Sequence, residues 1–312
     1  MFAGLRHQYR SSLKSYDTEE NIDLAFYRPI GFVWAYLFRK LGVTPNAVTI
    51  ASIFLGVGAG VLFYYPSVWL NVAGIFLLIW ANSFDSADGQ LARMTGNYSK
   101  WGRILDGLSG DLWFASIYIA ICLRMNHFNS FFALHPWLIW LLAVVAGLCH
   151  AKQAAAADYY RQFHLFFVKG ESGSELDRAS DLAAQLRAMP LKGNFWRKLT
   201  LFIYKNYTDN QELMTPAMQL LRATIASRWP DGRIPESFSN AFRRASRPLM
   251  KYTNILTFNW RSIVLFITVP AGCPWIYFVV EIVVFTVIMV YMIWRHEKMC
   301  CTFTLQISQD RY

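Results

Sequence analysis

Charged residues are scarce in this sequence. They make up 16% of the 312 residues, whereas hydrophobic residues make up 55% and aromatic residues 17%, and the mean hydropathy is +0.25. An ordinary soluble domain has about 25% charged residues. This composition excludes a disordered chain, a collagen and a small disulfide-linked scaffold. It favours a membrane protein.

Cysteine pairs with metal-binding or redox spacing are also missing. The five cysteines include no C-x-x-C pair, which argues against a zinc ribbon or a thioredoxin-like motif, and we interpret them as packing residues. The first forty residues lack a short apolar run followed by a small-residue cleavage site. We therefore expect the first apolar segment to be structural and not a removed signal peptide.

The apolar residues are gathered into six blocks that are interpreted as membrane spans. A spanning helix needs about 20 mostly apolar residues. The fifth block is short and is interrupted by Pro270 and Pro274, which suggests a tilted or kinked helix supported by its neighbours. The sequence predicts an all-α, polytopic membrane protein with six transmembrane helices. The blocks are residues 45–65, 68–84, 104–123, 137–157, 262–274 with its approach, and 275–294.

The basic residues predict the orientation of the chain. If the N-terminus is cytoplasmic, 29 of the 30 Lys and Arg residues lie on the inner side and only Arg124 lies outside. Both termini and the active site are then cytoplasmic. A nucleic-acid-binding protein would need basic and aromatic residues interleaved in a recognisable module. No such module is present, and we predict no nucleic-acid partner.

Four segments follow from this reading. Residues 1–44 form a cytoplasmic N-terminus with an amphipathic interfacial helix over 24–42, and residues 45–161 hold the first four spans. Residues 162–260 form a helical cytoplasmic insertion, and residues 261–312 hold the last two spans and a cytoplasmic C-terminus. Thr44 as N-cap and Pro45 at the first helical position mark the start of the first span.

Four carboxylates lie at the inner ends of the second and third spans. Asp85 and Asp88 are three residues apart and share a helical face, Asp106 opens the next helix, and Asp111 follows. Ionised groups at membrane depth are costly and usually mark ion or substrate sites. Carboxylates from two antiparallel helices form an oxygen cage that suits Mg²⁺, Mn²⁺ or Ca²⁺. A metal in turn implies a phosphate ligand.

Neighbouring residues support a phosphate site. Gly89 permits close backbone approach, Ala92 leaves room, and Arg93 offers a bidentate fork to phosphate. The alternative is a solvated interfacial loop in which the acids pair with Arg93, Lys100 and Arg103. Four acids at these spacings favour the binding site over that loop.

This stretch resembles the signature of the CDP-alcohol phosphotransferase family, D-x2-D-G-x2-A-R-x8-G-x3-D-x3-D. The match is literal from Asp85 to Asp106, but Gly110 stands at the position of the fourth acid and Asp111 comes one residue later. On an ideal α-helix the extra residue turns the side chain by about 100°. A π-bulge would restore its direction. The resemblance covers about residues 27–161 and does not extend to the insertion.

The resemblance implies a homodimeric, six-helix membrane enzyme of phospholipid synthesis with a two-metal site for Mg²⁺ or Mn²⁺. It implies that Asp106 and Asp111 are the catalytic residues, with Asp111 as the general base. The implied metal ligands are Asp85, Asp88, Asp106 and Asp111. The implied CDP-binding residues are Gly89, Ala92, Arg93 and Gly102.

The implied reaction transfers a phosphatidyl group from CDP-diacylglycerol to a polar alcohol and releases CMP. Lys152, Arg161 and Arg261 are candidates to receive an anionic acceptor, which favours inositol phosphate. Inositol, serine and glycerol phosphate stay open as acceptors. The other reading of the three cations is positive-inside anchoring and contact with membrane lipid headgroups.

Other functions stay open at this point. The roles of the substrates are reversed in a CDP-aminoalcohol phosphotransferase that acts on diacylglycerol or ceramide. An ion transporter also carries acids at membrane depth, although here they cluster at one membrane face. The displaced Asp111 suggests a catalytically silent scaffold. Glu281 in the last span is interpreted as a structural partner of another polar group.

Overall fold

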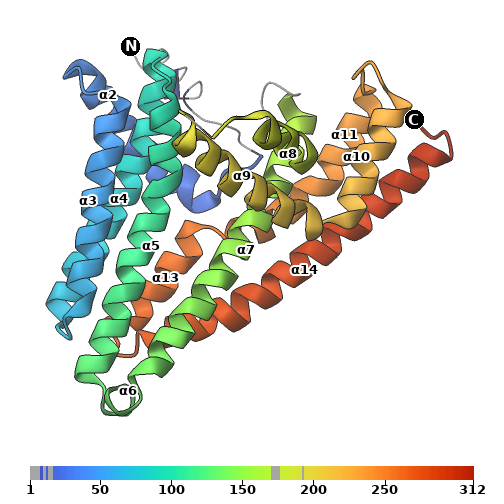
Figure 1. Ribbon diagram of the computed structural model, residues 1–312. Helices are drawn as coiled ribbons and strands as arrows, with labels where there is room; N and C mark the ends of the chain where they lie inside the picture. The colour runs from blue at the N-terminus through green and yellow to red at the C-terminus, as the bar shows by residue number, and fades with distance from the viewer. Residues whose placement is uncertain (1–7, 10–11, 13–16, 170–175, 192) are drawn as a thin grey trace. The chain divides into compact units, whose positions relative to one another are not determined.

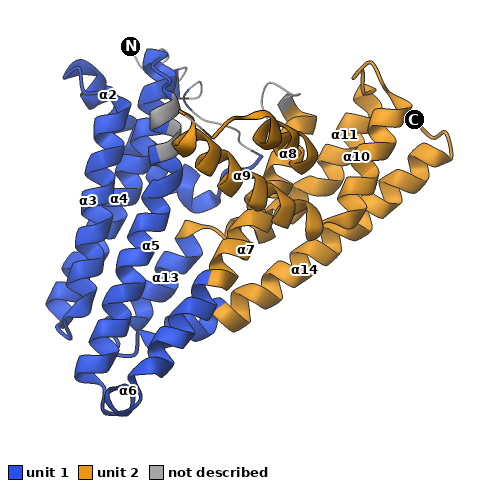
Figure 2. Cartoon of the chain, in the orientation of Figure 1, with its two compact units in different colours: residues 1–147, 259–281 blue, residues 148–258, 282–312 orange. Residues whose placement is uncertain are grey.

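The computed structural model describes residues 8–9, 12, 17–169, 176–191 and 193–312. These residues are mostly helical and contain no strand, as the predicted all-α class requires. Residue contacts divide the chain into two units (Figure 2): unit 1 comprises residues 1–147 and 259–281, and unit 2 comprises residues 148–258 and 282–312. The four segments predicted from the sequence are bounded by the expected membrane crossings, whereas the two units are defined by residue contacts. The four segments therefore stay a prediction.

Unit 1 is built around α3, which packs against both α4 and α5 (Figure 1). Small residues allow the close approach, because a Cβ atom on Gly56 would collide with the Trp113 ring and one on Gly60 with the Ser116 side chain. The helices of this unit are η1 (Asp23–Tyr27), α2 (Arg28–Lys40), α3 (Pro45–Tyr64), α4 (Val68–Thr95), α5 (Lys100–Phe128), α6 (Ser130–Leu134) and most of α13 (Phe258–Thr268). The long helices α7 (Pro136–Lys169) and α14 (Trp275–Ser308) contribute to both units.

The N-terminal part of the predicted interfacial helix is a π-helix, η1, followed by α2. One face of α2 packs on α4, where Gly31 lies so close that a Cβ atom would come 2.8 Å from Ser86 Oγ. The opposite face exposes Val33 and Leu37. The start of α3 agrees with the sequence: Pro45 is its first residue, and the Thr44 side chain accepts a hydrogen bond from the Ala47 amide at 3.3 Å.

Five described helices are long and apolar enough to cross a membrane: α3, α4, α7, α14 and residues 105–128 of α5. The predicted fifth span corresponds to α13, which has only 11 residues. Such a helix rises about 16 Å, which is less than the roughly 30 Å of a hydrocarbon core. The predicted count of six complete spans is therefore not confirmed.

Helix α13 nevertheless joins segments of unit 1 that are far apart in the sequence. Near its start, Asn259 donates to Glu20 at 2.6 Å and to Asp23 at 2.8 Å. Just after its end, the Val269 carbonyl accepts hydrogen bonds from Asn71 and from Arg124. The first of these donors, Asn71, lies near the start of α4, and the chain then turns and returns in α14. Arg124, predicted to lie in an outer loop, is instead a buried residue of α5.

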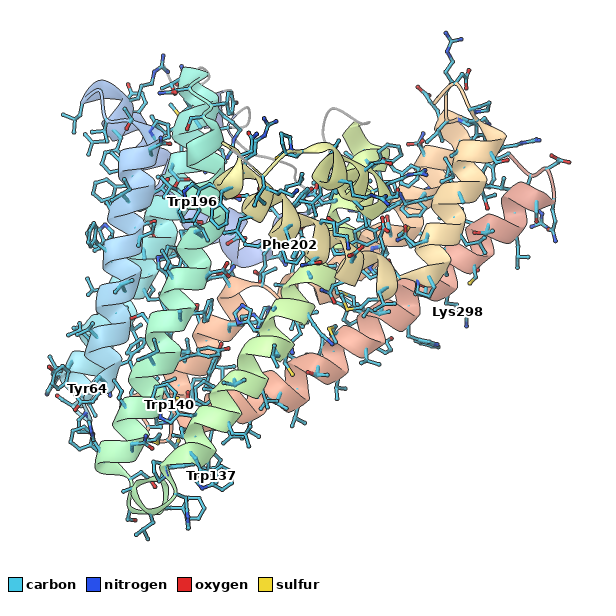
Figure 3. The ribbon with its side chains drawn as sticks, in the orientation of Figure 1. Tyr64, Trp137, Trp140, Trp196, Phe202 and Lys298 are labelled. Carbon is cyan, nitrogen blue, oxygen red and sulfur yellow. The ribbon has the colours of Figure 1, made fainter. Side chains whose placement is uncertain are left out.

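Aromatic side chains gather at one end of unit 1. Figure 3 shows Tyr64 at the end of α3 and Trp137 and Trp140 at the start of α7. Trp137 is 63% exposed. Tryptophan and tyrosine are enriched at membrane–water interfaces, because their rings are apolar and carry one polar group. The aromatic residues are consistent with a membrane boundary at this level of unit 1.

Unit 2 contains the short helices of the insertion, and their helical character was expected. An aromatic core of Phe167, Phe238, Phe242 and Phe303 joins α7, α11 and α14. Glu297 accepts hydrogen bonds from the first amides of α10, which fixes that helix start to α14. The helices are α8 (Ala179–Ala188), α9 (Phe195–Leu213), α10 (Pro216–Arg228), α11 (Glu236–Ser246), η3 (Arg247–Leu249) and α12 (Met250–Ile255).

Candidate metal and phosphate site

Three of the predicted carboxylates come together in unit 1. Asp85 and Asp88 extend from α4 and Asp106 from α5, and one ligand oxygen of each lies within 4.8 Å of the others. Asp88 is buried, Asp85 is half-buried and Asp106 is exposed. The three-residue spacing places the first two on one face of α4, and the antiparallel helix α5 supplies the third. The arrangement is a set of oxygen ligands with one side open.

Two hydroxyl groups that the sequence analysis did not select hold these carboxylates. Thr49 on α3 donates to Asp88 Oδ2 at 2.5 Å. Ser109 on α5 lies 2.8 Å from Asp85 Oδ1 and 2.8 Å from the backbone oxygen of Asp106. Thr49 lies one turn after the start of the first span, and Ser109 lies one turn after Asp106. A hydroxyl residue at such a position inside an apolar span could be recognised in the sequence, although its partner could not.

Arg28 is a further neighbour that the sequence analysis placed in the interfacial helix. Its guanidinium forms an ion pair with Glu19 at 2.9 Å and donates to Ser86 Oγ at 3.3 Å. Its backbone oxygen accepts from Gln90 at 3.1 Å. Because Ser86 follows Asp85 directly, these contacts hold the start of α2 against the carboxylate-bearing part of α4.

The predicted phosphate-binding residues lie one turn further along α4. The Arg93 guanidinium lies beside Gly89, with two nitrogens 3.5 Å from the place that a Cβ atom would take on that glycine. Arg93 Nε donates to the backbone oxygen of Ser12. Ala92, between them in sequence, is half-buried. Gly89 therefore leaves the backbone uncovered next to a guanidinium, close in sequence to the three carboxylates.

Residues 42–167 match the family model described as CDP-alcohol phosphatidyltransferase. This chain carries a CDP-alcohol phosphatidyltransferase domain. The domain contains the three carboxylates, their hydroxyl partners and the Gly89–Arg93 segment. The signature resemblance noted in the sequence is thereby confirmed.

Named relatives each match part of this chain. An archaetidylinositol phosphate synthase of Pyrococcus horikoshii is 42% identical over 84 residues, which are 27% of this chain and 43% of the relative. A phosphatidylinositol phosphate synthase of Corynebacterium glutamicum is 35% identical over 106 residues, 34% of this chain and 42% of the relative.

A third relative is named for a different acceptor. The CDP-diacylglycerol–glycerol-3-phosphate 3-phosphatidyltransferase of Cereibacter sphaeroides is 30% identical over 96 residues, 30% of this chain and 40% of the relative. In each of these matches the chain spans less than half of the relative's length. No solved structure gives a significant match.

Gly102 lies near the start of α5, where α5 packs against the start of α3. A Cβ atom on Gly102 would come 2.5 Å from Asn46 Oδ1 and 2.9 Å from Ser99 Oγ. The Ser99 hydroxyl accepts from the Gly102 amide at 2.8 Å and caps the helix. These contacts explain a glycine at this position by helix packing alone, and its place in a CDP site stays a prediction.

Alanine variants of Gly89 and Gly102 test what each of these two glycines is for. Gly89→Ala meets only ordinary contacts within the protein and replaces a glycine inside a helix, so we expect unchanged or slightly higher thermal stability. If the donor approaches this backbone, the same change lowers CMP release. Gly102→Ala should lower the unfolding midpoint instead, because Asn46 and Ser99 must move. Parallel loss of stability in both variants would argue against a donor site at Gly89.

Asp111 is not a member of the carboxylate group. Helix α5 is continuous α-helix from Lys100 to Phe128 and contains no π-bulge. Five residues along such a helix turn a side chain by about 140° from Asp106. Asp111 is exposed, and at Gly110, the position of the family's fourth acid, a Cβ atom would meet no other residue within 4 Å. The domain has open space where that acid would stand.

The three basic residues predicted to receive the acceptor lie in different surroundings. Lys152 and Arg161 lie on α7 in unit 2, and Arg161 donates to Asn254 at 3.4 Å. Arg261 on α13 is 1% exposed and forms an ion pair with Glu281 of α14, which is fully buried. The interpretation of Glu281 as a structural partner agrees with this pair. The acceptor role of all three cations stays a prediction.

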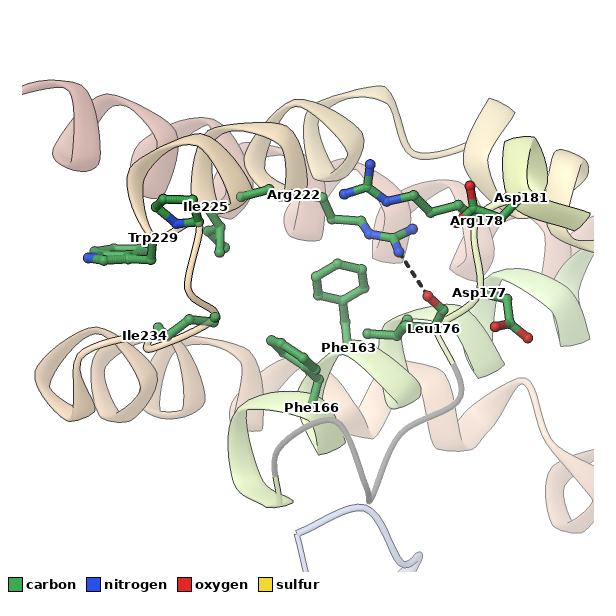
Figure 4. A pocket seen from close by; sticks show the side chains of 13 residues that line it. Phe163, Phe166, Leu176, Asp177, Arg178, Asp181, Arg222, Ile225, Trp229 and Ile234 are labelled. Atoms are coloured by element: carbon green, nitrogen blue, oxygen red, sulfur yellow. Dashed lines mark hydrogen bonds between the residues drawn. The ribbon is translucent and has the colours of Figure 1, made fainter. Parts of the chain in front are cut away.

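Unit 2 contains a cavity of about 500 Å³ that includes none of the three carboxylates (Figure 4). Phe163, Phe166 and Trp229 form its aromatic walls, and Arg178 and Arg222 lie along one side. Arg222 donates to the Leu176 carbonyl at 2.9 Å, and its guanidinium lies 5.6 Å from the Phe163 ring centroid. These bonds tie the segment before α8 to α7 and α10. The sequence analysis gave no indication of this cavity.

Proposed function

We propose that this protein is a membrane CDP-alcohol phosphotransferase that transfers a phosphatidyl group from CDP-diacylglycerol to inositol phosphate and releases CMP. The observation that carries the proposal is the convergence of Asp85, Asp88 and Asp106 inside the CDP-alcohol phosphatidyltransferase domain. Two of the relatives named above are an archaetidylinositol phosphate synthase and a phosphatidylinositol phosphate synthase, which supports the acceptor. The relative named for glycerol 3-phosphate marks the nearest competing acceptor.

The carboxylate group suits a hard divalent cation. Its three ligands are all oxygens, and Asp85, Asp88 and Asp106 would hold Mg²⁺ or Mn²⁺. A bound divalent ion neutralises the diphosphate and stabilises the charge that develops on the leaving CMP. The same set would also hold the second ion of a two-metal site, as the resemblance implies.

The chain's own residues then orient the reaction. Thr49 and Ser109 fix the directions of Asp88 and Asp85, so that the ligand oxygens need little rearrangement. The Arg93 guanidinium beside Gly89 would donate to the diphosphate of the donor. Attack by the acceptor hydroxyl on the β-phosphorus forms the new P–O bond and breaks the bond to CMP. The hydroxyl proton passes to a general base.

The assignment of that base is open to direct test. The resemblance proposes Asp111, and loss of a general base usually costs a factor of about 10²–10⁴ in rate. Because Asp111 is exposed and α5 turns it away from Asp106, we expect Asp111→Asn to reduce CMP release by less than about tenfold. A loss of 100-fold or more, with unchanged thermal stability, would establish Asp111 as the base and require α5 to rearrange during turnover.

The proposed activity is tested by CMP release from purified protein with Mg²⁺ or Mn²⁺. CDP-diacylglycerol is supplied with inositol phosphate, inositol, glycerol phosphate or serine, and CDP-choline or CDP-ethanolamine is supplied with diacylglycerol or ceramide in parallel. Turnover only with CDP-diacylglycerol and inositol phosphate is the expected result. Activity only in the parallel series would reassign the lipid to the acceptor side, and no CMP in either series would favour a scaffold.

The proposed assembly and orientation follow from the sequence and the domain. We propose an integral, multi-pass protein with both termini and the site on the cytoplasmic side, since nearly all Lys and Arg residues then lie inside. We also propose a homodimer, as the family resemblance implies. A detergent-purified mass of two chains tests the dimer, and protease protection of tagged termini in sealed vesicles tests the orientation.

A further inference from the structure

Helix α14 changes character at Trp294. It has 34 residues, a length of about 51 Å, and is therefore longer than the roughly 30 Å hydrocarbon core. Residues 282–294 expose several valines and end in exposed Tyr291 and Trp294. Arg295 and Lys298 then follow on the exposed surface. An apolar run that ends in aromatic and then basic residues is typical of a helix leaving the membrane at a headgroup layer.

A groove of about 660 Å³ lies at this transition, within unit 2. Buried Leu249 of η3 lines one wall, and Tyr291, Trp294, Arg295 and Lys298 of α14 line the other. Figure 3 shows Lys298 on the outer side of α14, directed away from the neighbouring helices of unit 2. The groove thus combines an apolar wall with two cations.

The cations of the groove are held in place by aromatic rings. Arg295 donates to the Tyr291 hydroxyl at 2.8 Å, and Lys298 Nζ lies 5.6 Å from the Trp294 ring centroid. The Tyr291 ring contacts Tyr252 with centroids 5.1 Å apart, and Lys251 Nζ lies 4.9 Å from the Tyr252 ring. Arg295 and Lys298 are thereby positioned in the groove at low cost in side-chain freedom, and Lys251 lies outside its lining, beside Tyr252.

No acidic side chain compensates these charges among the described residues that line the groove. The nearest acid along α14, Glu297, directs its oxygens to the amides of Ala217 and Met218 at the start of α10. The groove is therefore positively charged, amphipathic and next to the exposed valines of α14. These properties complement a ligand with an anionic head and an apolar tail.

We propose that this groove binds the phosphate headgroup of an anionic membrane phospholipid. Arg295 and Lys298 donate to the phosphate, Trp294 lies at the level of the glycerol backbone, and the acyl chains run along the exposed valines of α14. The proposal does not depend on the activity proposed above, because the groove belongs to unit 2 and uses none of the three carboxylates. An inorganic phosphate would share the cations but not the apolar wall.

The test uses the full chain in nanodiscs of phosphatidylcholine doped with brominated phosphatidylglycerol or brominated phosphatidylcholine. The fluorescence of wild type minus that of Trp294→Phe isolates the signal of Trp294. We expect brominated phosphatidylglycerol to quench this signal at a mole fraction about tenfold lower than brominated phosphatidylcholine. Equal quenching by both lipids would mean general lipid contact and would overturn the proposal.

Charge variants test the groove directly. Arg295→Gln with Lys298→Gln should abolish the preference of about tenfold for the anionic lipid, because each basic residue near an anionic lipid surface contributes to it. The matched control, Arg187→Gln with Arg233→Gln, removes two exposed cations of unit 2 elsewhere and should keep the preference. An unchanged preference in the groove variant would refute the site. Relief of quenching by inorganic phosphate, but not by an equal ionic strength of chloride, would assign the groove to free phosphate instead.

Discussion

Replacing Asp88 by asparagine is expected to lower CMP release by at least about 100-fold while the protein keeps its fold. Asp88 supplies one of three converging ligand oxygens and is 4% exposed. The metal's contribution to charge stabilisation amounts to several kcal/mol, and each 1.36 kcal/mol changes the rate tenfold. The Thr49 hydroxyl can still donate to the amide oxygen of asparagine, so the local packing is preserved. CMP release at saturating substrates measures the effect.

Thermal unfolding separates this result from a damaged fold. Without metal, three neighbouring carboxylates repel one another, so Asp88→Asn should unfold in chelator at the wild-type temperature or slightly above it. In wild type, added Mg²⁺ or Mn²⁺ should raise the midpoint, because an ion that binds only the native state stabilises it. That increase should be absent in Asp88→Asn. Asp209→Asn, an equal change on the exposed side of α9, should keep both the activity and the metal response. A metal response that survived in Asp88→Asn would remove this residue from the ligand set.

The carboxylate group was predictable because it depends on local rules. Asp85 and Asp88 share a helical face through their spacing, and the short connection between consecutive spans brings Asp106 back to the same end. The start of α3 at Pro45 was predictable for a similar reason, since an N-cap followed by proline fixes one helix end. Patterns within a few residues were sufficient for both.

Contacts between distant segments could not be read in this way. The hydroxyl of Thr49 meets Asp88 only because α3 and α4 pack closely through small residues, and nothing in the local sequence around either residue records that pairing. Arg28 looked like an interfacial cation, although it packs against Ser86. The short helix α13 was read as a span because apolar residues and prolines do not reveal where a buried helix ends. The cavity of unit 2 also depends on long-range packing.

Replacing Arg261 by alanine is expected to destabilise unit 1 more than any surface change. Arg261 and Glu281 are 1% and 0% exposed, and they join α13 to α14. Removing the cation leaves a buried carboxylate without its counter-charge, which typically costs about 3–5 kcal/mol. The midpoint of thermal unfolding in detergent measures the loss. Lys205→Ala breaks a partly exposed ion pair with Asp209, one turn away on α9, and should change stability by at most about 0.5 kcal/mol.

A double replacement separates the effect of the two buried charges from the effect of the contact between α13 and α14. Arg261→Met combined with Glu281→Leu fills similar volume with apolar groups, and such replacements of buried ion pairs are commonly neutral or stabilising. We therefore expect the double variant to regain the stability that Arg261→Ala loses, since the cost lies in the unpaired carboxylate and not in the absence of the bond. A double variant as unstable as Arg261→Ala would show that the pair fixes the position of α13 through its geometry. A rise in KM for inositol phosphate in the stable double variant would report the acceptor contact predicted for Arg261 from the sequence.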